Sequence, residues 1–60
     1  MHTTTPLQTR ESLDELVAVY PRDSYPACGD HITHDLTTWR VHTIAWGTGF
    51  QYIIATAEPI

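Results

Sequence analysis

Residues 37–46 read Thr-Thr-Trp-Arg-Val-His-Thr-Ile-Ala-Trp, and after the turn Gly47-Thr48-Gly49 residues 50–56 read Phe-Gln-Tyr-Ile-Ile-Ala-Thr. Both segments are rich in β-branched and aromatic residues, which favour extended strands. A short glycine-containing connection between two such segments is typical of a β-hairpin. A phosphate-binding loop would need a helix after its glycines, and here a strand pattern follows them. We therefore expect an antiparallel hairpin in this part of the chain.

The chain changes character twice before this hairpin. Residues 31–36 can add a short strand, which would extend the hairpin to a three-stranded meander over about residues 31–57. Residues 21–30 contain two prolines, a glycine and two aspartates, a composition typical of turns and irregular chain. We expect residues 21–30 to be a linker.

The segment from residue 9 to residue 20 has the spacing of an amphipathic helix. Four apolar residues at i, i+3, i+4 and i+7 would share one face: Leu13, Leu16, Val17 and Tyr20. Pro21 would end the helix, because the residue before a proline disfavours helical geometry. The start is open, since Thr5, Thr9 and Ser12 each fit a capping position. We prefer Thr9, because Leu7 would lie off the apolar face.

These segments together predict an α+β fold in one small domain, residues 1–60. The N-terminal amphipathic helix, about residues 9–20, would pack on a two- or three-stranded antiparallel sheet. A chain of this length buries about 60% of the surface that its unfolded form exposes, so its core is small. Each predicted strand carries apolar residues on both faces, and one helix covers only one of them. The other face is expected to pair two chains in a homodimer, unless the linker and the N-terminal segment cover it.

Charge and composition exclude several classes of protein. The formal net charge is −4, with three basic residues against seven acidic ones. Nucleic-acid binders need a basic patch, which three scattered arginines do not make, and seven acids are too dilute for an acidic mimic of DNA. Residues 1–5 lack the features of a signal peptide, and no apolar run approaches the ~20 residues of a membrane span. The single cysteine is typical of a reducing compartment, so we expect a cytoplasmic protein without nucleic-acid or membrane partners.

Two sets of residues are candidates for a site. Tryptophan and tyrosine dominate the energetics of protein interfaces, so the candidate contacts with a partner protein are Trp46, Trp39, Tyr25, Ile44 and Ile53. Imidazole and thiolate groups are zinc ligands, so the alternative is a zinc site formed by Cys28, His31, His34 and His42. Their spacing matches no common zinc module. A cysteine nucleophile with a histidine base is the weaker reading, because 60 residues leave little room for a substrate pocket.

The sequence thus predicts a small, non-enzymatic protein that binds or inhibits another protein, acts as a homodimer and needs no cofactor. Size and charge are typical of accessory or regulatory factors, including those encoded by phages and mobile elements. The alternative function is a small metal-binding module that uses Cys28 and the histidines.

Overall fold

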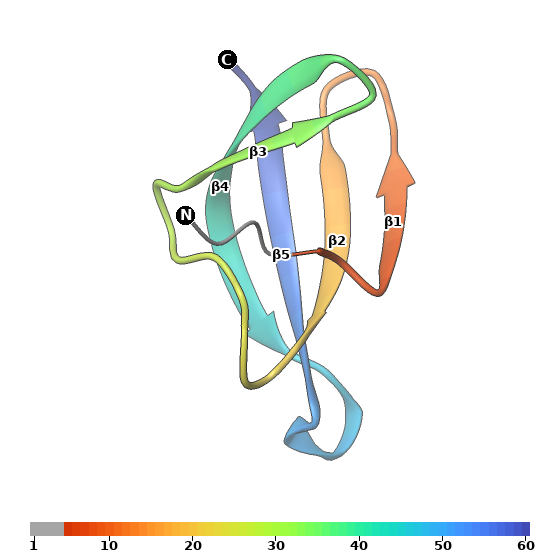
Figure 1. The fold of residues 1–60 in the computed structure, drawn as a ribbon, viewed down its shortest axis with the longest axis vertical. Coiled ribbons are helices and arrows are strands. Elements are labelled where there is room, and N and C mark those ends of the chain that lie inside the picture. Colours follow the sequence, from red (N-terminus) through yellow and green to blue (C-terminus); the bar gives the residue numbers. More distant parts are fainter. Residues whose placement is uncertain (1–4) are drawn as a thin grey trace.

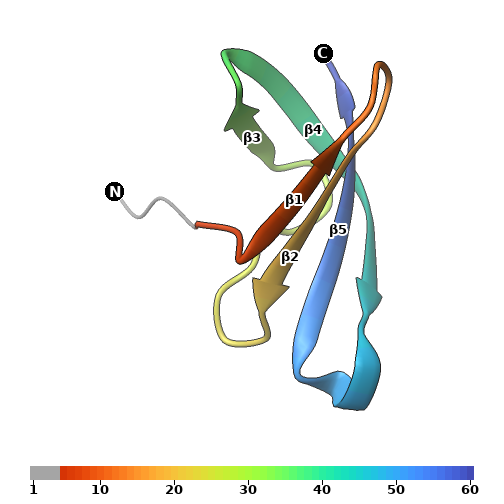
Figure 2. The ribbon, with the colours of Figure 1, turned by 90° about the vertical axis from the view of Figure 1, so that its right-hand side faces the viewer.

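The computed structural model describes residues 5–60, apart from the side chain of Thr48, and these residues form a single antiparallel sheet (Figure 1). The elements in chain order are β1 (Gln8–Glu11), β2 (Leu16–Pro21), β3 (His31–His34), β4 (Thr37–Trp46), the short 3-10 helix η1 (Thr48–Phe50) and β5 (Tyr52–Pro59). The strand order across the sheet is β1-β2-β5-β4-β3. The sheet curls into a half-barrel with a concave and a convex side (Figure 2).

The expected α+β fold is wrong, because the described residues contain no α-helix. The predicted helix is instead two strands joined by a turn, in which the Ser12 amide and hydroxyl both donate to the Glu15 carbonyl, at 2.8 and 3.1 Å. Leu16–Pro21 then pairs along its whole length with Tyr52–Ala57 of β5. No helix in the described part of the chain is long and apolar enough to cross a membrane.

The prediction of a helix failed because the same residues fit both a helix and a strand. Leu16 and Tyr20 share a face both at helical spacing and at the two-residue period of a strand. The β-branched Val17 and Val19 favour the strand, and β5 supplies hydrogen-bond partners that a local pattern does not reveal. Leu13, which the helix needed as an apolar contact, is fully exposed at the turn.

The concave side of the sheet is the core of the protein. Its side chains come from every second position of β2, β4 and β5, and those at 2% exposure or less are Leu16, Ala18, Tyr20, Trp39, Val41, Ile53, Ala55 and Ala57. Three alanines lie in this set and pair across β2 and β5 with each other or with Leu16. Small side chains at the centre leave room for the large rings of Tyr20 and Trp39 when the sheet curls.

A β-bulge in β4 changes which side chains of the hairpin face the core. The pairing with β5 shifts between Val41 and Thr43, so that one extra residue, His42, is accommodated. A bulge of this kind reverses which later side chains face the core. Ile44 therefore packs on the core with Val41, whereas simple alternation would have placed them on opposite sides.

Burial of Tyr20 makes the stability of the fold depend on alkaline pH. The Tyr20 ring is 1% exposed, and loss of hydration on burial raises the pKa of its hydroxyl above the ordinary value of 10.0. The folded state therefore holds this proton more tightly than the unfolded state. The resulting stability is present below pH 10 and is lost as pH rises through the higher pKa of the folded protein.

We expect the free energy of unfolding to fall as the pH is raised above about 10, because the unfolded chain then loses the Tyr20 proton first. Urea unfolding followed by circular dichroism at several alkaline pH values measures this slope. Tyr20→Phe should flatten it, whereas Tyr52→Phe, at an exposed position, should retain it. An unchanged slope in Tyr20→Phe would show that another group is responsible.

Candidate protein-interaction surface

The predicted interaction residues divide between the core and the surface. Trp39 and Ile53 are buried at 2% and 0% exposure, and Ile44 is half-buried against the same core. Trp39 and Ile53 therefore pack within the fold, and Ile44 exposes only part of its side chain. Trp46 and Tyr25 are exposed.

The two exposed residues meet at one end of the molecule, together with Phe50. The ring centroids of Tyr25 and Trp46 are 6.5 Å apart, and those of Trp46 and Phe50 are 6.1 Å apart, both in edge-to-face geometry. Such arrangements of aromatic rings are favourable and fix the rings relative to one another. Tyr25 comes from the β2–β3 loop, Trp46 from the end of β4 and Phe50 from η1, beside the hairpin at the bottom of Figure 1. We call these three residues the aromatic end.

The turn that holds Phe50 is closed by backbone hydrogen bonds. The Gly47 amide donates to the Tyr52 carbonyl at 2.8 Å, and the Phe50 amide donates to the Gly47 carbonyl at 3.1 Å. Gly49 and Phe50 both have positive φ, at 69° and 56°. Glycine adopts this conformation readily, but a phenylalanine pays a steric cost there.

Phe50 was missed by the sequence reasoning, which placed it in a strand. Its ring is 68% exposed, so the strained backbone is not offset by burial of the side chain. Bulky residues with positive φ cluster at functional sites, where a local cost is tolerated. A signal was present in the sequence, because a second glycine directly before Phe50 allows the chain to stay in a turn for one more residue.

The proposed zinc ligands are not brought together. Among residues 5–60, no group of three or more histidine, cysteine, aspartate or glutamate side chains is placed to hold a metal ion. Cys28 is exposed in the β2–β3 loop, His31 lies on the edge strand β3 and His42 is in the bulge of β4, where its Nδ1 lies 2.7 Å from the Thr43 hydroxyl. The structure therefore does not gather three or more of these four residues into one metal-binding group.

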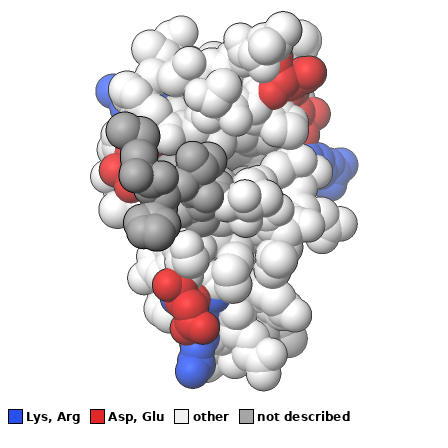
Figure 3. Space-filling model, in the orientation of Figure 1, with Lys and Arg blue, Asp and Glu red and all other residues white. Residues whose placement is uncertain are grey.

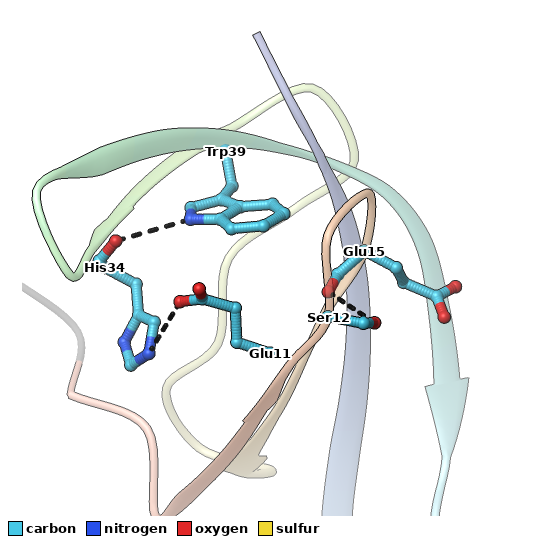
Figure 4. Close-up of polar contacts among 5 residues, drawn as sticks. All are labelled: Glu11, Ser12, Glu15, His34 and Trp39. Carbon is cyan, nitrogen blue, oxygen red and sulfur yellow. Dashed lines mark hydrogen bonds and ion pairs between the residues drawn. The ribbon is translucent and has the colours of Figure 1, made fainter.

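His34 instead connects the two edge strands of the half-barrel. Its Nε2 atom lies 3.4 Å from a carboxylate oxygen of Glu11 on β1 (Figure 4). Its backbone carbonyl accepts a hydrogen bond of 3.4 Å from the Trp39 indole. The edges of the sheet thus approach each other at the end opposite the aromatic end, and the core residue Trp39 lies beneath this contact.

Charged side chains are dispersed around the concave side, which is largely uncharged in its visible part (Figure 3). Near the aromatic end, Arg22 and Asp23 form a loose and exposed pair at 4.0 Å. Exposed pairs of this kind contribute little to stability. The aromatic end therefore presents apolar rings next to one positive and one negative side chain whose charges cancel.

Comparison of the chain with protein-family models, with curated proteins and with solved structures gives no significant match.

Proposed function

We propose that this protein is a small, non-enzymatic protein that acts by binding another protein through its aromatic end. The observation that carries the proposal is the exposed cluster of Tyr25, Trp46 and Phe50, at 41%, 52% and 68% exposure. Tryptophan and tyrosine are enriched among the residues that contribute most to protein interfaces. Contacts among the rings hold them in place before binding, so less side-chain entropy is lost when a partner binds.

The backbone of Phe50 supports the same proposal. A glycine at this position would adopt the observed φ of 56° without strain. The phenylalanine costs stability there and exposes most of its ring to water. Contact with a partner would bury the ring and so compensate for this cost.

Self-association is part of the proposal and would use the convex side of the sheet. Val17, Val19 and Ile54 are half-buried on this side, around the pairs that join β2 and β5, and the described elements leave it uncovered (Figure 2). The molecule measures 30 × 26 Å across the view of Figure 1. This outline sets an upper limit to the contact area of one face, which is close to the roughly 800 Å² that each partner buries in a stable complex. A second copy is therefore the proposed occupant.

The aromatic end can be tested by site-specific photo-crosslinking. A benzophenone amino acid replaces Phe50 in cells that produce the protein, and the products are separated by mass. We expect one discrete product of this chain joined to another protein, because the ring at position 50 would lie in the interface. Adding Trp46→Ala should abolish the product, since it removes the ring that holds position 50 in place.

Thr33 on β3 is the matched control, because it is exposed and lies far from the aromatic end along the sheet. The same photo-reactive residue at Thr33 should not give the product formed from position 50. Identical products from both positions, or none from position 50, would contradict the proposed surface. A product of twice the chain mass would show that the aromatic end contacts a second copy rather than a different protein.

A further inference from the structure

Two leucines are fully exposed at the end of the molecule opposite the aromatic end. Leu13 lies in the β1–β2 turn at 100% exposure, and Leu36 lies in the β3–β4 turn at 101%. Both turns lie at the top of Figure 1, and Figure 2 shows them on opposite sides of this end. Isolated exposed leucines are common in proteins, but here each of the two turns that close this end of the sheet carries one at its tip.

A hollow opens between the two turns. Its volume is about 390 Å³, and its lining includes Leu13, Thr37, Trp39 and Pro59. The contact between Glu11 and His34 bridges the two edge strands beside it (Figure 4). This space is large enough for an apolar side chain from another molecule, and Leu13 forms part of its rim.

The same end carries most of the net charge of the protein. Four of the seven acidic residues lie in or beside the two turns: Glu11, Asp14, Glu15 and Asp35. Arg22 pairs with Asp23 and Arg40 pairs with Glu58, so most of the formal charge of −4 comes from this end, next to Arg10 on β1. Of these four carboxylates only Glu11 pairs with a described residue, His34. Acidic atoms gather at the upper right of Figure 3, over these turns.

Leu36 is also held in an unfavourable backbone conformation. Asp35 and Leu36 have φ values of 54° and 65°, the pattern of a tight hairpin turn in which asparagine and glycine are the preferred residues. A leucine there is sterically strained. It gains no burial within the chain, so the fold itself does not explain why a leucine occupies the tip.

We propose that this leucine end, defined by Leu13, Leu36 and the four carboxylates around them, binds a basic segment of another protein that carries apolar side chains. The carboxylates would attract the positive charge, and the leucines with the hollow would receive the apolar residues. Complementary charge steers such an encounter and selects the partner. The proposal is independent of the aromatic end, because the two surfaces lie at opposite ends and share no residue.

An amphipathic helical peptide of leucine and arginine serves as the probe. Two-dimensional NMR of the labelled protein follows the titration, first at low salt and then at 0.3 M or so. We expect shifts at residues of the two turns and a marked loss of affinity at the higher salt. The double variant Leu13→Ser/Leu36→Gly should weaken binding about tenfold or more.

Two controls make the result decisive. Leu7→Ser changes an exposed leucine outside the leucine end and should leave the affinity unchanged, and a peptide with glutamate in place of arginine should not bind. Leu36→Gly should raise Tm by roughly 5 °C, because glycine relieves the strained turn, so lost binding would not reflect unfolding. Absence of binding, shifts outside the two turns, or equal affinity of the double variant would each overturn the proposal. Each of these results leaves the test of the aromatic end unaffected.

Discussion

Trp39→Ala is expected to unfold most of the protein, whereas Trp46→Ala leaves it folded. Trp39 is 2% exposed among core residues and its indole donates to the His34 carbonyl. Truncation of a buried tryptophan costs about 3–5 kcal/mol. The total stability of a 60-residue domain is about 3–9 kcal/mol, so this loss removes much or all of it.

Trp46 provides the matched control because it is the other tryptophan of the chain. Half of its surface is exposed and its ring contacts are with other exposed aromatic residues, so we expect its loss to cost about 1 kcal/mol or less. Thermal unfolding by circular dichroism measures both variants. Similar losses of stability in the two variants would contradict the assignment of Trp39 to the core and Trp46 to the surface.

The second large effect concerns the proposed dimer. Val19→Lys together with Ile54→Lys should change the particle mass from two chains to one at tens of micromolar or so. Neighbouring lysines would meet the same lysines of the second copy across the two-fold axis, and burying unpaired charge is costly. Sedimentation equilibrium reports the mass against the 6.8 kDa of one chain.

Ser24→Lys is the control for this experiment, because it adds positive charge at an exposed position of the β2–β3 loop, outside the sheet. This variant should retain the mass of two chains. A wild-type protein that sediments as a single chain would contradict the dimer. A double variant that still has the mass of two chains would place the interface on a different surface.

The C-terminal part of the fold was accessible from the sequence, because its strand pattern is local. β4 and β5 occupy the residues that are rich in β-branched and aromatic side chains, around a glycine turn. The N-terminal part was not accessible in this way. Leu16–Tyr20 fits a helix and a strand equally well, and only its long-range pairing with β5 decides between them.

The candidate surface was predicted only in part, because the burial of a side chain also depends on long-range packing. Tyr25 and Trp46 were selected as aromatic residues, and the structure exposes both. Trp39 was selected on the same grounds, but it is buried. Residue type alone does not distinguish the two tryptophans, because their burial depends on the curl of the whole sheet. The bulge at His42 also changes which later residues face the core, and no local pattern marks its position.

The proposed function rests on the statement that Trp46 contributes to binding and not to folding. The most direct measurement is the affinity of the protein captured by crosslinking at position 50, compared between wild type and Trp46→Ala by calorimetry, with Tm of both recorded. We expect the affinity to fall at least about tenfold while Tm changes by only a few degrees. An unchanged affinity, or a loss that accompanies unfolding of the variant, would contradict the account.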